Sequence, residues 1–254
     1  MARHRLRDYA DDHLPARKTL KDYRAVAFSI IVPVLDEAAA LPALLTSLAP
    51  WRNVGAEIIV ADGGSLDASV EIAERGGAKV VRCERGRARQ MNAGAAAAHG
   101  DVLLFLHADT RLPETTRETI TQAVAANARW GFFALTIVGR HPLLAVIARA
   151  ASLRSRLTGI ATGDQAIFVT RELFDTVGGF PDIPLMEDIA FSRRLRERAH
   201  PAKLKLKAET SARRWEQGGM LRTVFLMWRL RLAYALGTSP AKLARRYADV
   251  RERR

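Results

Sequence analysis

The first half of the chain alternates between short apolar runs and longer segments of helical composition. Phe28–Leu35 is rich in β-branched residues and too short for a helix, which indicates a buried strand. A helical segment that ends at Pro50 separates it from the next apolar run. The predicted strands are 28–35, 57–61, 78–82 and 101–106, and the predicted helices are 38–49, 67–75 and 87–98. This alternation predicts an α/β fold with a mostly parallel central sheet flanked by helices.

Carboxylates and one imidazole follow the last apolar residues of three predicted strands. Asp36 and Glu37 follow the first strand, Asp62 follows the second, and His107 and Asp109 follow the fourth. Ligands of parallel α/β sheets bind beyond the carboxyl ends of the strands. We therefore expect these side chains to meet in one crevice.

The second half of the chain is patterned less regularly. It contains an apolar segment at 142–151, a predicted strand at 165–169, a predicted helix at 171–177 and the turn-rich loop Gly178–Pro181. It contains no internal repeat and no low-complexity linker. We expect one domain over residues 28–240 that ends in an amphipathic helix at 221–240.

The charge of the chain is strongly positive and concentrated near its ends. The 254 residues include 40 Lys and Arg against 27 Asp and Glu, a net charge of +13. The basic residues gather in the first 24 positions and from Arg193 onward, which predicts a flexible basic arm at 1–27 and a basic tail at 241–254. Such a charge favours polyanions, whether nucleic acid, anionic lipid or a nucleotide diphosphate.

Several features of the sequence indicate the cellular compartment of the protein. Cys83 is the only cysteine, so no disulfide forms within the chain, and a reducing compartment is expected. The first residues lack the apolar stretch of a signal peptide. No run reaches the roughly 18 apolar residues that a spanning helix needs. A cytoplasmic protein is expected, with attachment to the inner face of the membrane as an alternative.

The usual phosphate-binding motifs are absent, because the sequence has neither GxxxxGK[ST] nor a GxGxxG after the first strand. A carboxylate at the end of a buried strand offers another solution, since it can hold Mg²⁺ or Mn²⁺, which then bridges diphosphate oxygens. Asp109, in Leu104–Asp109, is the candidate metal ligand. Its alternative role is to cap the following helix.

Five motifs occur in the order found in family 2 glycosyltransferases, which the chain resembles over residues 28–240. They are Ile31–Glu37, Ala61–Asp67, Gly86–Gly94, His107–Asp109 and Leu185–Asp188. The resemblance implies a GT-A fold, the fold of nucleotide-diphospho-sugar transferases. It also implies that residues 28–240 form one catalytic domain, with a nucleotide-sugar-binding half at 28–112 and an acceptor and catalytic half at 113–220. Within the family, the segments 163–165, 187–188 and 213–215 look most like the small bacterial group labelled as arsenosugar-biosynthesis glycosyltransferases.

The resemblance also implies roles in binding the donor. Pro33 and Glu37 would lie near the nucleobase and ribose, and Asp62 would accept a hydrogen bond from the base of a UDP- or GDP-sugar. Arg89 and Asn92 lie three apart on one helical face and would reach the diphosphate or the sugar. The alternative for the arginines of this segment is a solvated basic helix.

Two positions depart from the family pattern. His107, a predicted donor contact, stands where the first Asp of the D-x-D motif is usual, so the metal would depend on Asp109 and the donor's phosphates. Ser211 stands where the Q-x-x-R-W motif of processive synthases has Gln, although Arg214 and Trp215 match it. Processive export is therefore not expected.

The resemblance places catalysis at Glu187 and Asp188, which precede an amphipathic segment. Asp188 would be the base that takes the acceptor's proton in an inverting transfer, and Glu187 would orient it or touch the acceptor. Capping of the helix is their alternative role. The remaining predicted acceptor or sugar contacts are Asp164, Gln165, Arg214 and Trp215.

The predicted function is inverting transfer of a hexose-type sugar from a nucleoside diphosphate to a small or lipid-linked acceptor. A sugar-phosphate nucleotidyltransferase is one alternative, but Asp36–Glu37 occupies the place of its Gly-rich loop. A nucleic-acid-binding protein is another, but no recognition motif accompanies the charge. Segment 221–236 is basic and aromatic, and membrane contact, core packing and dimer packing all remain open for it. The oligomeric state and the acceptor are also left open.

Overall fold

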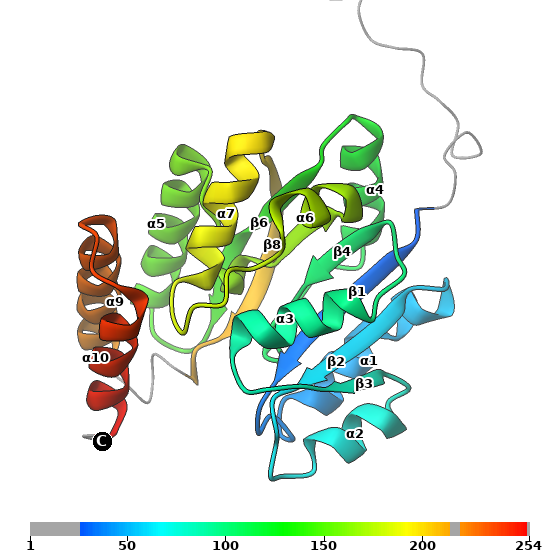
Figure 1. Cartoon of the computed structure of the whole chain (residues 1–254), viewed down its shortest axis with the longest axis horizontal. Coiled ribbons are helices and arrows are strands. Elements are labelled where there is room, and N and C mark those ends of the chain that lie inside the picture. The colour runs from blue at the N-terminus through cyan, green and yellow to red at the C-terminus, as the bar shows by residue number, and fades with distance from the viewer. Residues whose placement is uncertain (1–25, 214–218, 253–254) are drawn as a thin grey trace, which may run out of the picture.

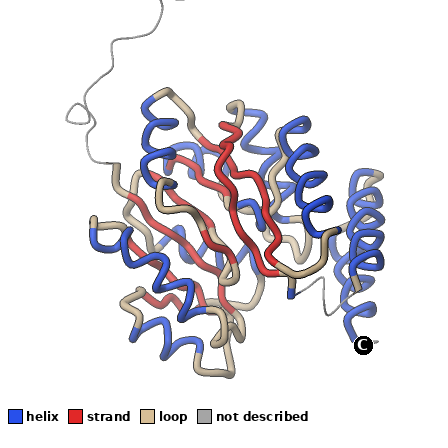
Figure 2. Tube along the Cα trace, turned by 180° about the vertical axis from the view of Figure 1, so that it is seen from behind, coloured by secondary structure: helices blue, strands red, loops and turns tan. Residues whose placement is uncertain are grey.

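The chain forms one mixed sheet with helices on both faces (Figures 1 and 2). The structure is a computed structural model that describes residues 26–213 and 219–252. The predicted contacts Arg214 and Trp215 and almost all of the predicted arm therefore lie outside the described residues. The strands are β1 Phe28–Val34, β2 Glu57–Asp62, β3 Lys79–Arg82, β4 Val102–Phe105, β5 Thr110–Arg111, β6 Trp130–Val138, β7 Ile167–Thr170 and β8 Ala202–Ser211.

The helices cover the sheet and extend beyond it at the C-terminal end of the chain. They are α1 Leu41–Asn53, α2 Ser69–Arg75, α3 Arg87–Ala96, α4 Thr116–Ala125, α5 Leu143–Thr158, α6 Arg171–Val177, α7 Glu187–Arg198, α9 Met220–Ala235 and α10 Pro240–Glu252, with a 3-10 turn, η2, at Gly163–Gln165. Helix α10 occupies most of the segment predicted as a basic tail. Strands β6 and β8 and helix α4 lie in stretches for which the sequence pattern predicted no element.

The sheet has the order β3-β2-β1-β4-β7-β6-β8-β5. The first four of these strands are parallel to one another, as the sequence predicts. Strand β7 is antiparallel to both of its neighbours, and β6 and β8 are again parallel. The α/β fold with a mostly parallel sheet is thus confirmed, and each antiparallel pairing involves β7 or β8, from the second half of the chain.

Two apolar layers hold the helices to the sheet. Alternate residues of β1 point to opposite faces, so Ile30 and Val32 pack with α1 and α4, whereas Ile31 packs with α3, α6 and α7. All three side chains have no exposed surface. Full burial on both faces explains why the parallel strands read as continuous apolar runs.

Helix α1 continues past the residue at which the sequence pattern ended it. Pro50 lies inside the helix, which runs on to Asn53, so the predicted end is wrong. The next residue, Trp51, is only 5% exposed, and its ring meets Phe28 edge to face at a centroid distance of 5.3 Å. Burial of this large aromatic side chain stabilises the last turn and offsets the hydrogen bond that proline cannot donate.

Candidate active site

The carboxyl ends of β1 and β2 are tied together by a glutamine from α3. The Gln90 side-chain amide donates to the carbonyl oxygens of Val34 at 2.7 Å and Ala61 at 3.0 Å. Gln90 is 4% exposed, and a Cβ on the adjacent Gly63 would lie 2.9 Å from its amide carbon. The motif Gly86–Gly94 therefore acts through Gln90 to set the spacing of the two strands.

Asp62 ends β2 and faces the turn that follows it. Its carboxylate accepts backbone N–H groups from Gly64 and Ser65, each at 3.1 Å. Gly64 has φ +91°, a left-handed conformation that suits glycine. The turn thus orients a carboxylate that is 3% exposed.

Hydrogen bonds join the loop after β1 to the loop after β2. The Asp36 N–H donates to Ser65 Oγ at 2.9 Å, and the Ala38 N–H donates to Asp67 Oδ2 at 3.0 Å. The hydrogen bond from Ser69 is the main cause that lowers the pKa of Asp67. These bonds bring the predicted nucleobase-binding segments into one rigid edge. Pro33 lies just before this edge, half-buried in β1 beside Ala61.

Glu37 joins this edge to the end of β8. Arg213 Nη2 lies 3.1 Å from Glu37 Oε1 and 2.9 Å from Oε2. The two residues are 176 positions apart in the chain. The predicted ribose contact is therefore also one half of an ion pair that connects the first strand to the last long strand.

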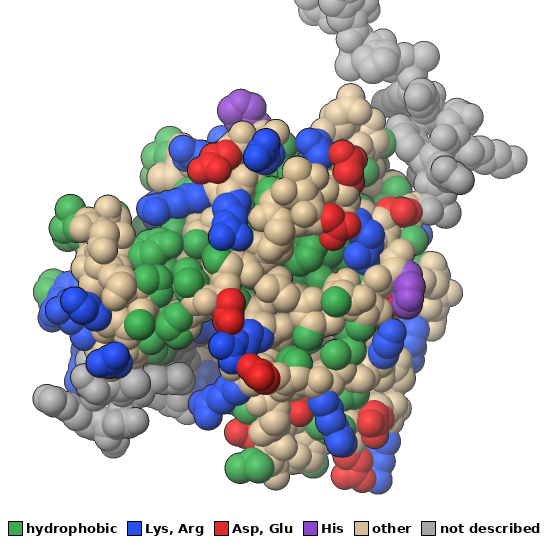
Figure 3. Space-filling view, in the orientation of Figure 1, with side chains coloured by type: hydrophobic (Ala, Val, Ile, Leu, Met, Phe, Trp, Pro, Cys, Tyr) green, Lys and Arg blue, Asp and Glu red, His purple; other side chains and the backbone are tan. Residues whose placement is uncertain are grey.

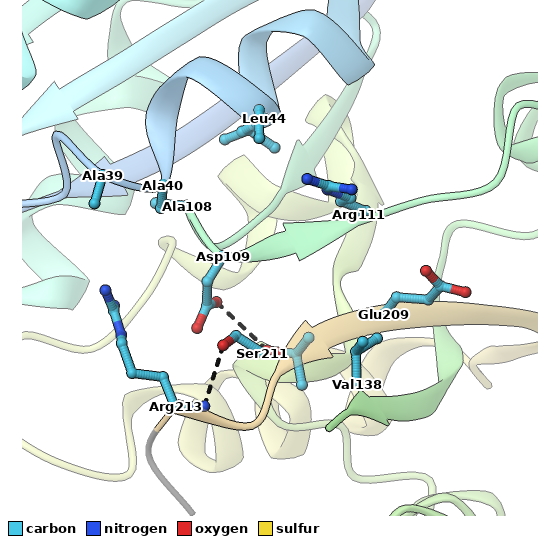
Figure 4. A pocket seen from close by; sticks show the side chains of 12 residues that line it. Ala39, Ala40, Leu44, Ala108, Asp109, Arg111, Val138, Glu209, Ser211 and Arg213 are labelled. Carbon is cyan, nitrogen blue, oxygen red and sulfur yellow. Dashed lines mark hydrogen bonds between the residues drawn. The ribbon is translucent and has the colours of Figure 1, made fainter. Parts of the chain in front are cut away.

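Asp109 lines a cavity with a volume of about 430 Å³ (Figure 4). Its Oδ1 lies 3.5 Å from Thr110 Oγ1 and 3.4 Å from Thr210 Oγ1, both long for hydrogen bonds. These two hydrogen bonds of the Asp109 carboxylate are therefore weak. The cavity is lined by Ala39, Ala40, Ala43, Leu44, Ala108, Asp109, Arg111, Val138, Glu209, Thr210, Ser211 and Arg213.

His107 points to the other side, toward η2. Its Nδ1 lies 3.4 Å from Asp164 Oδ1, and its side chain is 16% exposed. A Cβ on Gly163 would lie 2.5 Å from His107 Nε2, so only glycine permits this approach. His107 thereby brings the end of β4 against the second half of the chain.

Asp188 occupies the first turn of α7 and is held by backbone groups. Its Oδ2 accepts the Gly163 N–H at 2.8 Å, and its Oδ1 accepts the Ile189 N–H at 2.7 Å. The N-terminal end of a helix also favours negative charge. Gly163 therefore touches both His107 and Asp188, which links the predicted donor half to the predicted base.

Glu187, the neighbour of Asp188, is buried, with a side chain only 4% exposed. Arg87 Nη1 of α3 lies 3.4 Å from its Oε1. Burial raises the pKa of Glu187, and the charge of Asp188 adds to that effect, whereas Arg87 and His107 oppose it. Five charged or titratable side chains therefore gather around η2: Arg87, His107, Asp164, Glu187 and Asp188.

Gln165 stabilises the η2 turn, around which this cluster gathers. Its side-chain nitrogen donates to the Phe133 carbonyl at 3.0 Å, and its oxygen accepts from Ser155 Oγ at 2.6 Å and from the Thr162 N–H at 3.2 Å. Gln165 is completely buried. The side chain therefore holds the η2 turn in place within the protein interior.

Arg89 and Asn92 both contact the loop before α7. Arg89 Nε lies 3.0 Å from both carboxylate oxygens of Asp182, and its Nη1 lies 2.6 Å from Glu84 Oε2. The Asp182 hydrogen bond is the main cause that raises the pKa of Arg89. Asn92 bonds the backbone of Phe180 in both directions, donating at 2.8 Å and accepting at 2.9 Å.

A second, small cavity lies beside Asp188 and is closed by the C-terminal helices. Met227 and Arg231 from α9 and Tyr247 from α10 line it together with Asp188. Arg154 of α5 lies nearby. Burial and then the charge of Arg231 lower its pKa to about 10, while Asp188 and Asp164 act in the opposite direction.

No three His, Cys, Asp or Glu side chains of residues 26–213 and 219–252 are grouped so that they could hold a metal ion. Asp109 contributes one carboxylate, close to two threonine hydroxyls, so a metal there would need further oxygen ligands. This donor set suits a hard cation that arrives with phosphate oxygens.

Residues 29–132 match the family model described as Glycosyl transferase family 2. The match takes in less than half of the chain. The matched segment contains β1, β2 and β4, which carry Asp36, Asp62 and Asp109 at their ends.

The sequence of a mycobacterial glycosyltransferase is similar over a longer part of the chain. The chain is 32% identical over 176 residues to a PGL/p-HBAD biosynthesis glycosyltransferase of Mycobacterium bovis, a match that covers 61% of this chain and 64% of the relative. The chain thus spans just under two thirds of the length of that relative.

Two solved structures show the same GT-A fold. Residues 1–349 of S. aureus TarS in complex with UDP-GlcNAc align with a TM-score of 0.60 at 21% identity, covering 73% of this chain and 58% of that one. Glucosyl-3-phosphoglycerate synthase from Mycobacterium tuberculosis in complex with Mn²⁺, UDP and phosphoglyceric acid aligns with a TM-score of 0.59 at 20% identity, covering 84% and 79%.

Some residues of the site were not among those predicted from sequence. Gln90, Arg213 and Gly163 make the contacts that join its parts. Each lies within or beside a motif that the sequence did reveal, but nothing in the spacing of the motifs indicates which side chain reaches across. Their partners are 25 to 176 positions away in the chain.

Proposed function

We propose that the protein is an inverting glycosyltransferase that moves a sugar from a nucleoside diphosphate to a small or lipid-linked acceptor. The observation that carries the proposal is the contact of Gly163 with both His107 and Asp188. It brings the end of β4, where the donor's diphosphate would lie, next to a carboxylate at a helix N-terminus. An inverting transfer needs a base beside the donor sugar.

Asp188 acts as the base. Each of its oxygens accepts one backbone N–H, which orients the carboxylate and leaves lone pairs for an acceptor hydroxyl. The acceptor oxygen bonds to the anomeric carbon as its proton passes to Asp188, and the bond from that carbon to the diphosphate oxygen breaks. Glu187 and Asp164 flank the base and contact the acceptor.

Asp62, Glu37 and Pro33 bind the nucleoside at the edge formed by β1 and β2. The TarS structure contains UDP-GlcNAc and the glucosyl-3-phosphoglycerate synthase structure contains UDP, which supports a uridine nucleotide as donor. A GDP-sugar is the alternative. Arg89 and Asn92 serve the site by holding the loop before α7, and Gln165 serves it by holding η2.

Asp109 holds Mg²⁺ or Mn²⁺ together with the donor. When bound, the ion supplies positive charge to the leaving diphosphate. The Mn²⁺ in the structure of glucosyl-3-phosphoglycerate synthase supports this assignment. Because one carboxylate is a weak ligand set, metal and donor bind together. Arg214 and Trp215 would complete the sugar or acceptor contacts, and the arsenosugar-type resemblance remains a prediction about substrate.

Thermal unfolding with UDP-, GDP- and dTDP-sugars, each with and without Mn²⁺, tests the proposal. A ligand that binds the native state raises the melting temperature by mass action. We expect one nucleotide class to do so, more strongly with Mn²⁺, and Asp109→Asn to remove the metal-dependent part. A flat response to all three donors would show that the proposed function is wrong.

Asp188→Asn separates the base from the binding groups. We expect its donor-induced shift to equal that of the wild type, while sugar transfer falls by about 10²–10⁴-fold. Asp175→Asn, at an exposed position on α6, is the matched control and should keep both properties. Normal turnover by Asp188→Asn would exclude Asp188 as the base.

A further inference from the structure

Helix α9 is apolar on two opposite sides. Its inner side contributes Leu230, which is 3% exposed, to a cluster with Met186, Ile189 and Leu243. Its outer side exposes three large apolar side chains at the spacing of one helical face, and a fourth follows the last residue of the helix. They are Phe225 at 64%, Trp228 at 71%, Leu232 at 62% and Leu236 at 78% exposure.

Helix α5 carries a second outward apolar face. Leu144 and Ala148 are buried against Leu135 and Ile137 of β6, while another set of side chains points to solvent. These residues also recur at helical spacing. They are Leu143 at 39%, Val146 at 57%, Leu153 at 58% and Leu157 at 77% exposure.

The two helices are neighbours. Arg154 of α5 lies close enough to Arg231 of α9 for their charges to interact. Both cartoon views place α5 beside α9 at one side of the molecule (Figures 1 and 2). The space-filling view shows apolar side chains gathered on that side, with basic side chains around them (Figure 3). Such a gathering on one side of a protein marks an interaction surface.

The charge of the two helices indicates what covers them. Neither 143–158 nor 220–235 contains an Asp or Glu. Arg149 and Arg156 on α5 and Arg222 and Arg229 on α9 are exposed. A second copy of this chain would oppose arginine to arginine, whereas anionic lipid headgroups complement arginines that flank an apolar face.

We propose that the outward faces of α5 and α9 dock on an anionic lipid bilayer. No described helix is long and apolar enough to cross a membrane, so the contact is with the surface. The inner side of α9 supplies Met227 and Arg231 to the cavity beside Asp188. Docking therefore places that cavity about 10 Å, one helix diameter, from the lipid. The consequence for a lipid-linked acceptor rests on the proposed function.

Co-sedimentation of the full chain with vesicles tests the docking surface without any sugar nucleotide. Vesicles of phosphatidylcholine with about 30% phosphatidylglycerol should bind the chain, and pure phosphatidylcholine should bind it much less, because each arginine near an anionic surface contributes about fivefold in affinity. Arg222→Gln with Arg229→Gln should lower binding about 25-fold. Phe225→Ser with Trp228→Ser should lower it at least about tenfold.

Matched controls lie on other surfaces. Val54→Ser removes a side chain that is 54% exposed on the far end of α1, and Lys203→Gln with Lys205→Gln removes two exposed charges from β8. Both controls should bind vesicles like the wild type. All these positions are exposed, so circular dichroism should show an intact fold.

Equal binding to both vesicle types, or unchanged binding by both α9 variants, would overturn the proposal. So would a concentration-dependent dimer, measured by sedimentation velocity, that Phe225→Ser with Trp228→Ser dissociates, since a second copy would then be the occupant. A chain that binds vesicles but no sugar nucleotide would retain this surface and lose the proposed function. A chain that binds a sugar nucleotide but no vesicles would retain the proposed function and lose this surface.

Discussion

At the scale of single residues, Glu187 combines burial with a nearby positive charge. The side chain is 4% exposed and faces Arg87 at 3.4 Å. Burial disfavours its charged form and raises its pKa, while Arg87 lowers it. The attraction to Arg87 thus helps to hold the Glu187 carboxylate next to Asp188, although the negative charges of these two carboxylates repel each other. Arg87 is therefore expected to affect both the stability of the protein and the electrostatic environment of Asp188, the proposed base.

Arg87→Gln should destabilise the protein in a pH-dependent way. Without Arg87 the pKa of Glu187 rises further, so the folded state binds a proton at pH values where the unfolded state does not. Stability is then gained as the pH falls through that window. Because Arg87 is 38% exposed, we expect a loss of only about 1 kcal/mol at pH 8, and less at pH 5.

Thermal unfolding at the two pH values measures this difference. Arg75→Gln is the control, since it breaks the exposed pair with Glu71 on α2 and should change stability by less than about 0.5 kcal/mol. A deficit for Arg87→Gln that is equal at pH 5 and pH 8 would contradict the coupling to Glu187.

At the scale of elements, α3 organises the site through its polar side chains. Gln90 reaches the ends of β1 and β2, Asn92 holds the backbone of Phe180, and Arg87 meets Glu187. One helix thus positions both the edge proposed to bind the nucleoside and the loop that leads into α7. Gln90 and Asn92 lie three and five positions after Arg87. Their side chains can reach both the strands and the loop because α3 lies between the sheet and that loop.

Gln90→Met keeps the volume of the side chain but removes its donors. The buried carbonyls of Val34 and Ala61 would lose the donor that joins them, although the Val34 carbonyl would still accept the Gly63 N–H. We expect a loss of about 2 kcal/mol in urea unfolding. Gln122→Met, at an exposed position on α4, should change stability by less than about 0.5 kcal/mol. Similar losses in the two variants would refute the role of Gln90 as the link between the strands.

Asn92→Ala should loosen the loop before α7. It removes two hydrogen bonds to Phe180, so we expect a loss of about 1–3 kcal/mol and faster hydrogen exchange at the Phe180 amide. Arg89→Ala removes only exposed contacts and should cost less than about 1 kcal/mol. If Asn92→Ala instead kept its stability and lost donor affinity, Asn92 would be a donor contact and not a support for the loop.

At the scale of the whole molecule, the two ends of the parallel strands have different tasks. The carboxyl ends hold the proposed active site, and the amino ends hold a polar network around Glu57. His99 Nδ1 lies 2.7 Å from Glu57 Oε1, and Ser29 Oγ donates to the same carboxylate. Burial alone would raise the pKa of Glu57, but these hydrogen bonds lower it to about 2.

Glu57→Gln should therefore reduce stability at neutral pH but not in strong acid. A lowered carboxyl pKa contributes stability that is present above the ordinary value, near 4.5, and is lost as the pH falls toward 2. We expect a deficit of about 1 kcal/mol at pH 7 that shrinks below pH 4. Denaturant titrations at several pH values, with the exposed Glu74→Gln as control, provide the measurement. A deficit that persists at pH 2 would be inconsistent with this assignment.

The sequence by itself determined the parallel half of the sheet and the carboxylates at its edge. Continuous β-branched runs have few alternatives to a buried strand, and the residue after such a run lies at the carboxyl end of the sheet. That is why the positions of Asp36, Asp62 and Asp109 follow from the order of residues alone. The antiparallel direction of β7 and the long strands β6 and β8 did not follow from it, because their pairing joins segments that are distant in the chain.

Only the tertiary structure decided which side chains meet. Gly163 could contact both His107 and Asp188 only after η2 had been placed against the end of β4, and Arg213 could reach Glu37 only after β8 had joined the sheet. The C-terminal segment shows the same division. Its sequence is amphipathic by pattern, but burial of Leu230 and exposure of Trp228 follow from packing α9 on the rest of the chain. Local patterns determine elements, whereas contacts across the chain depend on how those elements pack.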